Sequence, residues 1–220
     1  MAEVEALPAA SVLVLRDAPL EVLLLRRHER SSFVPGAWVF PGGMVEPIDE
    51  ELARERADGS TLAAMRFAGA RETFEEAGIW LGAPLADAET KRRRLLGGEV
   101  SFRELLDEAP LDLEQLVWTS RWITPVGLPK RFDTWFFAVK SGRDVVATAE
   151  EVEMVDVAWV APAEALERSR RREMQMVFPT LRNLEAVAAF EDVDALLDAR
   201  RGANIEPVLP VLVNGKPTLP

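Results

Sequence analysis

The sequence predicts a single α/β domain, and three observations indicate it. Short apolar runs rich in β-branched residues alternate with longer segments whose apolar residues recur at helical spacing. Neither a clean linker nor an internal repeat divides the 220 residues, which are enough for one sizeable core. Hydrophobic residues make up 48% and charged residues 29%, an ordinary globular balance. We therefore expect one domain over residues 1–220.

The first expected elements are short strands. Residues 11–15 and 22–25 are apolar runs separated by a turn, and residues 38–40 form a third run that Pro41-Gly42-Gly43 stops. A loop and a charged segment, residues 50–58, follow before the next helix. The pattern assigns that segment neither a helix nor a strand.

A helix is expected from Thr61 to Ala77, because its apolar residues recur at helical spacing. Gly78 is well placed to end it, since glycine readily adopts the left-handed conformation of a helix C-terminus. The apolar stripe of this helix consists of Leu62, Met65, Phe67, Ala70 and Phe74. We expect Phe67, Ala70 and Phe74 to anchor the helix to a sheet.

The second half of the chain continues the alternation. Residues 84–116 are expected to be a helical insertion, in which Ser101 and Glu104 have the spacing of a capping box. Residues 205–220 form a proline-rich tail that we expect to be extended or disordered. The remaining predicted elements are strands at 132–139 and 155–160 and helices at 88–96, 162–171, 179–190 and 192–199.

Composition restricts the classes of partner and compartment. The net charge of −11 argues against sequence-independent nucleic-acid binding, which requires basic surface. It is compatible with a small anionic substrate if divalent cations bridge the oxygens of the substrate and the acidic oxygens of the protein. No apolar run is long enough for a membrane-spanning helix, and the N-terminus lacks the layout of a secretion signal. With no cysteine in the chain, we expect a cytoplasmic protein.

Three glutamates carry the predicted chemistry. On a helix, Glu72, Glu75 and Glu76 occupy positions i, i+3 and i+4, so their carboxylates project from one face and repel one another. Hard divalent cations with oxygen ligands would offset that repulsion. Arg71, four residues before Glu75, is close enough to orient a carboxylate. The alternative is a solvated acidic face without a ligand.

These residues, with the glycines before them, resemble the Nudix box, written G-x5-E-x7-R-E-U-x-E-E-x-G-U. Residues 40–43 (FPGG) and 71–79 (RETFEEAGI) carry the resemblance, and Gly43 matches the first glycine. Thr73 replaces a bulky apolar residue, and Asp49 stands where the first glutamate is expected. Arg71 follows Asp49 after 22 positions instead of 8, an insertion of 14 residues. The resemblance spans about residues 11–165.

The longer spacer is similar to the coenzyme A diphosphatase branch of that family. Flanking segments add to this likeness: LLLRR at 23–27, FVPGAWVFPGG at 33–43, WITP at 122–125 and RFDTWFF at 131–137. The resemblance implies an α/β/α sandwich with a mixed sheet. It also implies a Mg²⁺-dependent diphosphatase, with Mn²⁺ as an alternative cofactor. Family members are often dimers, and the tail could reach a partner chain.

The family pattern assigns roles to particular residues of this chain. Glu72 and Glu76 are the first choice for metal ligands, with Glu75 and the Gly43 carbonyl next. Arg71 would orient the carboxylates. Candidates for the general base are Glu75, Glu151 and Glu153. Candidates for outer phosphates are Arg26, Arg27, Arg30 and Arg131, because a guanidinium grips phosphate oxygens in a bidentate way.

Several functions stay open on this evidence. The favoured substrate is coenzyme A or an acyl derivative, followed by ADP-ribose and dinucleotides. A non-catalytic nucleotide-binding module on the same fold is a second class, although no helix glutamate is lost here. An isomerase of allylic diphosphates is disfavoured, because that chemistry in the family generally employs a cysteine.

Overall fold

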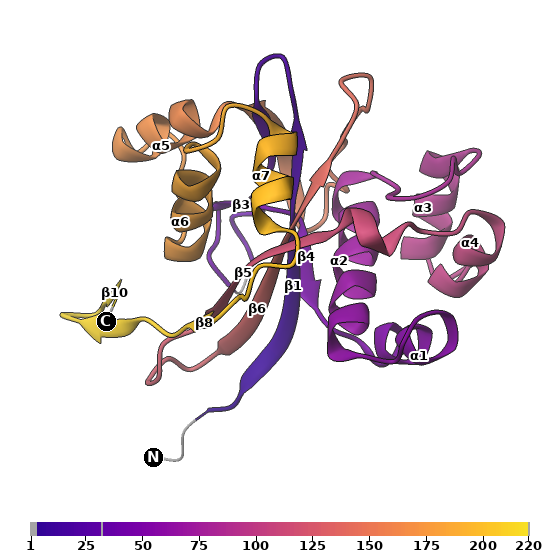
Figure 1. The fold of residues 1–220 in the computed structure, drawn as a ribbon, viewed down its shortest axis with the longest axis horizontal. Coiled ribbons are helices and arrows are strands. Elements are labelled where there is room, and N and C mark those ends of the chain that lie inside the picture. The colour runs from indigo at the N-terminus through magenta and orange to yellow at the C-terminus, as the bar shows by residue number, and fades with distance from the viewer. Residues whose placement is uncertain (1–3, 32, 220) are drawn as a thin grey trace.

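A computed structural model describes residues 4–31 and 33–219 of the chain. It shows a twisted mixed sheet between two layers of helices (Figure 1). Helices α1 to α4 lie on one side of the sheet, and α5 to α7 lie on the other. The α/β sandwich with a mixed sheet that the sequence predicts is therefore confirmed.

The large sheet has the strand order β3-β2-β1-β6-β5-β8, with β4 paired to β1 and β7 paired to β2. β1 pairs in parallel with β6, and β5 with β8, whereas the other pairs of this sheet are antiparallel. The strands are β1 (Ala6–Arg16), β2 (Glu21–Arg27), β3 (Trp38–Val39), β4 (Gly42–Met44), β5 (Val117–Ile123), β6 (Arg131–Lys140), β7 (Met154–Val160) and β8 (Pro207–Val208).

The sheet divides beside β1. Along one edge β1 pairs with β6 from residue 6 to residue 15. Along its other edge, β4 pairs with residues 9–11, and β2 pairs with residues 15 and 16. Among the described strands, β4 has no partner besides β1. The short glycine strand β4 therefore keeps one edge without a strand partner, and at that edge the Gly42 amide donates to Glu76 of α2.

Alternating side chains of the central strands fill two separate cores. On β1, Leu13 and Leu15 pack beneath α5 to α7, whereas Val12 and Val14 pack beneath α2. On β6, Phe136 belongs to the first core and Phe137 to the second, because consecutive side chains of a strand face opposite sides. The sheet is thus buried on both faces.

The helices are α1 (Pro47–Arg56), α2 (Thr61–Ala77), α3 (Ala88–Leu96), α4 (Phe102–Glu108), α5 (Pro162–Arg170), α6 (Phe178–Val187) and α7 (Val193–Arg200). Helix α2 has the predicted bounds. Ser60 caps its N-terminus by accepting a hydrogen bond from the Ala63 amide (3.1 Å), and Gly78 ends it in the left-handed conformation (φ 72°). The Ser101–Glu104 capping box also forms, at the start of α4.

Most of the charged segment, to which the sequence reading assigned no helix, belongs to helix α1. Pro47 occupies the first turn, and Glu46 and Asp49 form a capping box in which Glu46 replaces the usual serine or threonine. Leu52 of α1 packs against Phe67 of α2 in a third cluster that includes α4 residues. Phe67 therefore faces neighbouring helices rather than the sheet, whereas Ala70 packs in the core beneath α2.

Strands β4 and β5 were not predicted, because their glycines and polar residues hide the β pattern. The tail is extended: β8 joins the sheet beside β5, and β9 (Val211–Val213) and β10 (Lys216–Thr218) form a separate hairpin. The range 84–116 holds two short helices, α3 and α4, and a 3₁₀ turn at Leu113–Gln115. No helix in the described part of the chain has the length and apolar character to cross a membrane.

Candidate active site at the carboxylates of α2

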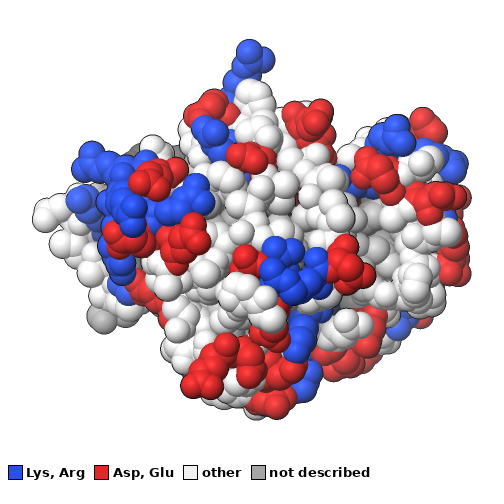
Figure 2. Space-filling model, turned by 90° about the horizontal axis from the view of Figure 1, so that it is seen from above, with Lys and Arg blue, Asp and Glu red and all other residues white. Residues whose placement is uncertain are grey.

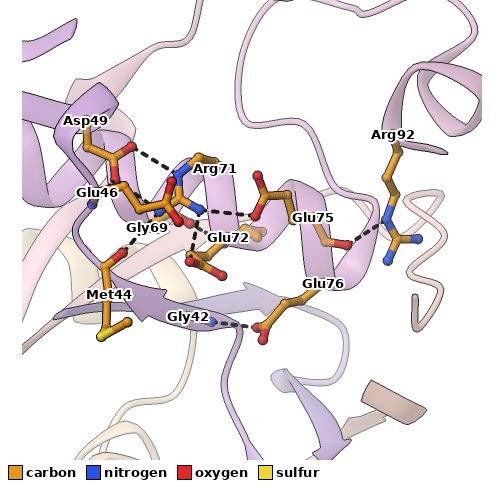
Figure 3. A network of polar contacts seen from close by, with 11 residues as sticks. Gly42, Met44, Glu46, Asp49, Gly69, Arg71, Glu72, Glu75, Glu76 and Arg92 are labelled. Atoms are coloured by element: carbon orange, nitrogen blue, oxygen red, sulfur yellow. Dashed lines mark hydrogen bonds and ion pairs between the residues drawn. The ribbon is translucent and has the colours of Figure 1, made fainter. Parts of the chain in front are cut away.

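Arg71 is the centre of a buried polar network between α1, α2 and β4 (Figure 3). Its Nε and Nη2 donate to the two carboxylate oxygens of Asp49, at 3.1 and 3.0 Å. Nη2 also donates to the Met44 carbonyl (3.0 Å), while Nη1 donates to Glu72 (3.0 Å) and Glu75 (3.1 Å). Burial alone would lower the pKa of Arg71, but these carboxylates raise it, so the guanidinium stays charged.

Glu72 lies against the backbone of Gly43. A Cβ atom added at Gly43 would overlap the Glu72 carboxylate, so only glycine lets β4 approach this side chain. Burial raises the pKa of Glu72 to about 7 against the pull of Arg71, and the charge of Glu75 adds to the rise. Burial therefore destabilises the negative charge of the Glu72 carboxylate, and Arg71 offsets this effect only in part.

Glu76 lies one turn further along α2 and reaches the neighbouring glycine. Its carboxylate accepts a hydrogen bond from the Gly42 amide at 2.8 Å, and the residue is 6% exposed. Burial, and then the charge of Glu72, raise the pKa of Glu76 well above its usual range. Glu72 and Glu76 thus form a repelling pair at the open edge of β4 (Figure 3).

The three glutamates do not behave alike. Glu72 and Glu75 share Nη1 of Arg71, whereas Glu76 turns to Gly42. Among the described residues, no group of three or more Asp, Glu, His or Cys side chains is arranged so that it could hold a metal ion. The set of metal ligands predicted from the sequence therefore stays a prediction.

The residues nevertheless fit a hard divalent cation. The donors that face β4 are carboxylate oxygens of α2: Glu72 lies against Gly43, and Glu76 lies at the Gly42 amide. Gly43, whose carbonyl is the further predicted ligand, pairs with Ala10 of β1. Oxygen donors are what Mg²⁺ prefers, and a cation between the two carboxylates would remove the repulsion that raises their pKa values. The glycine cradle next to Glu72 leaves room that a side chain would fill.

Three of the predicted residues meet at a cavity of about 330 Å³ close to Glu76. Its lining consists of Arg27, His28, Arg30, Ser31, Val152 and Glu153. Arg27 pairs loosely with Glu153 (3.7 Å), and the charges of both residues act on Glu76. The structure therefore brings Arg27, Arg30 and Glu153 together at one cavity, and two of them, Arg27 and Glu153, act on Glu76.

The other predicted residues lie outside this cavity. Arg26 pairs with Glu29 at 2.6 Å. Arg131 is buried at the start of β6 and donates to the carbonyls of Thr124 (3.0 Å) and Val4 (2.6 Å), contacts that hold loops. Glu151 is exposed in the loop before β7, and its backbone has a positive φ of 73°. The structure gives these three no contact with the α2 glutamates.

Sequence reasoning missed the partners that hold the glutamates in place. It left Asp49 without a role, yet Asp49 is fully buried and binds Arg71 in a bidentate way. It also missed Arg92 of α3, whose Nε donates to the Glu75 carbonyl (Figure 3). The position of Asp49 in the Nudix pattern was the available signal for the first of these.

Charges of both signs are interspersed over the face shown in Figure 2. On α5, which carries several arginines, the basic side chains pair with acidic neighbours: Arg168 with Glu164, and Arg170 and Arg171 with Glu167. Such exposed pairs contribute little to stability. They do distribute the charge of this helix so that it presents no single sign.

Comparison with known proteins agrees with the geometry. A family model described as a NUDIX domain matches residues 6–181. The chain is 29% identical to the acyl-coenzyme A diphosphatase NUDT19 of Gallus gallus, over 86% of this chain and 69% of that protein. It is 25% identical to putative nudix hydrolase 7 of Caenorhabditis elegans, over 84% of this chain and 62% of that protein.

A solved structure shows the same fold. A NUDIX hydrolase from Alicyclobacillus acidocaldarius superposes with a TM-score of 0.80 at 27% identity, covering 90% of this chain and 97% of the other. The two layers of helices and the mixed sheet are therefore the architecture of that family.

Proposed function

The chain belongs to the Nudix family as a pyrophosphohydrolase, and on that premise we propose that it hydrolyses a nucleoside diphosphate derivative with Mg²⁺ as its cofactor. Coenzyme A or an acyl-coenzyme A is the favoured substrate, because a relative matching most of the chain bears that name. ADP-ribose and dinucleotides are the alternatives. The observation that carries the proposal is the buried pair Glu72 and Glu76 at the glycines of β4.

In this proposal each residue has a distinct task. Glu72 and Glu76, with the Gly43 carbonyl, would hold the cation, and Arg71 orients the Glu72 and Glu75 carboxylates. Bound Mg²⁺ would neutralise the diphosphate and lower the pKa of an attacking water. Arg27 and Arg30 line the adjacent cavity and would bind phosphate oxygens outside the metal.

Glu75 is the preferred general base. Burial raises its pKa against the pull of Arg71, which brings a carboxylate closer to the range in which it accepts a proton at neutral pH. Its side chain is 23% exposed, enough to meet a water. Glu153 lines the cavity beside Glu76 and is the second candidate.

An exposed apolar strip supports a substrate with an apolar arm. Met44 directly follows Gly43 and is 46% exposed, and Leu7 on β1 is 43% exposed. Leu7 lies opposite Phe132 in the sheet register, and Phe132 contacts Phe33 edge to face (5.2 Å). Consecutive strand residues face opposite sides, so this strip leads from the edge of β4 onto the sheet face away from α2.

The arm of coenzyme A suits this strip better than ADP-ribose does. The pantetheine phosphate carries two methyl groups close to its phosphorus, whereas the corresponding part of ADP-ribose is a polyhydroxylated sugar. Apolar contacts next to the metal would therefore favour the pantetheine arm, at roughly 25 cal/mol per Å² of apolar surface buried.

The test is turnover of a diphosphate panel with and without Mg²⁺, comparing wild type with Glu76→Gln. Coenzyme A, acyl-coenzyme A, ADP-ribose and a dinucleotide should be offered, and Glu99→Gln provides a control at an exposed glutamate. We expect monophosphate products from wild type and the control, and a large loss in Glu76→Gln. Tight nucleotide binding without turnover would favour the non-catalytic module, and full activity in Glu76→Gln would overturn the proposed site.

A further inference from the structure

Arg92 is a buried arginine at the C-terminal end of α2, supplied by the neighbouring helix α3. Its side chain is 3% exposed, whereas those of the adjacent Arg93 and Arg94 are 70% and 51% exposed. Arginine is seldom buried so completely without a specific set of partners. Arg92 therefore differs from the arginines beside it.

The partners of Arg92 join three segments. Its Nε donates to the Glu75 carbonyl of α2 (2.9 Å), and its Nη1 donates to Thr148 Oγ1 in the loop before β7 (2.9 Å). The Thr148 amide in turn donates to the Ala77 carbonyl, the last residue of α2. Arg92 and Thr148 thus hold carbonyls of the final turn of this helix.

That final turn needs an outside cation. The last carbonyls of a helix lack partners within it and form its negative end. Helix α2 carries no basic residue in its last turn and instead places Glu75 and Glu76 there. Burial lowers the pKa of Arg92, and the charges of Glu89, Glu150 and Glu76 act against that shift.

Gly78 makes the contact sterically feasible. A Cβ atom added there would lie 3.1 Å from Nη1 of Arg92 and 3.2 Å from Thr148 Oγ1. The glycine that ends α2 therefore also leaves space for the guanidinium. Nη2 of Arg92 is buried without a hydrogen-bond partner among the described residues, so the guanidinium is not fully satisfied by the contacts that hold it.

We propose that Arg92 is a positioning residue, which fixes the last turn of α2 so that Glu75 meets Arg71 and Glu76 faces Gly42 of β4. This inference rests on the proposed function of the site. It also gives a task to the helical segment 84–116, which otherwise has no part in the chemistry. Residues that support metal ligands from outside typically change metal affinity or activity about 10- to 100-fold when removed.

The test compares Arg92→Met, Arg92→Lys and the exposed control Arg93→Met in the full chain. Mg²⁺ affinity is measured by calorimetry, together with kcat, the KM for substrate and the melting temperature. We expect Arg92→Met to weaken Mg²⁺ binding about tenfold or more. Its kcat should fall while the KM stays within about twofold. Arg92→Lys, which keeps the charge, should recover part of the loss, and Arg93→Met should match wild type.

The outcomes separate the two proposals. A lower melting temperature in Arg92→Met with unchanged Mg²⁺ affinity and kcat would make Arg92 a structural brace alone and overturn the inference. Wild type that neither binds Mg²⁺ nor cleaves any diphosphate would instead overturn the proposed function, and the positioning role with it. Wild type with normal binding and an Arg92→Met variant with weakened binding supports both.

Discussion

The substitution Asp49→Asn is the most stringent test of the network around Arg71. Asp49 is fully buried and takes two of the hydrogen bonds that Arg71 donates. Removing one partner of a buried ion pair commonly costs about 3–5 kcal/mol, because the remaining charge is left uncompensated. Here Glu72 and Glu75 still contact the guanidinium, so we expect the free energy of unfolding to fall by an amount near the lower end of that range, about 3 kcal/mol.

The assay is urea denaturation of wild type and variant without metal, with Asp107→Asn as the matched control. Asp107 pairs with Arg56 on the protein surface and is 63% exposed, so its loss should cost less than about 1 kcal/mol. In Asp49→Asn we also expect weaker Mg²⁺ binding, because Arg71 loses the partner that fixes its position and can no longer orient Glu72. A stability loss equal to that of Asp107→Asn would refute this account of the network.

Two further predictions concern pH and specificity. Burial raises the folded-state pKa of Glu72 to about 7 from 4.5, and that of Glu76 is also raised, so both retain protons in the folded protein that the unfolded chain has released. The metal-free protein should therefore lose stability as the pH rises from about 4.5 to 7. The increase in melting temperature that Mg²⁺ causes should be larger at pH 8 than at pH 5.5. Equal increases at the two pH values would contradict this prediction. Replacing Met44 by serine should lower kcat/KM for coenzyme A about 3- to 10-fold, because it removes apolar contact with the substrate. The turnover of ADP-ribose should stay within about twofold. Equal losses for both substrates would show that Met44 does not discriminate between them.

The sequence predicted α2 well because both of its ends carry local signals. Ser60 and Gly78 act within a few residues of the helix, so their effect does not depend on the rest of the fold. Helix α1 was missed because its capping box uses Glu46 and because its polar surface hides the short apolar face that packs on Phe67. A local pattern is a poor guide where packing against another helix decides the structure.

The site could be predicted only in part for a related reason. The spacing of Glu72, Glu75 and Glu76 puts them on one face, but it says nothing of the Gly42 amide or of Asp49, which are distant in sequence. Arg27, Arg30, Arg26 and Arg131 are equivalent in sequence as cations. Tertiary structure separates them, placing the first two at the cavity, Arg26 in an ion pair with Glu29 and Arg131 on loop carbonyls.

The same limitation applies to Arg92. Three consecutive arginines occupy positions 92–94, and nothing in their order reveals which one is buried. The packing of α3 beside α2 selects Arg92, whose guanidinium lies next to Gly78 and donates to the Glu75 carbonyl. Its contact with Glu75 is therefore a product of the fold rather than of a motif.

The proposed function depends on a divalent cation that binds between Glu72 and Glu76 at the open edge of β4. A crystal soaked in Mn²⁺ and measured at the manganese absorption edge tests it most directly. We expect an anomalous peak within ligand distance of both carboxylates, and the loss of that peak in Glu76→Gln. A peak elsewhere on the protein, or an undiminished peak in that variant, would contradict it.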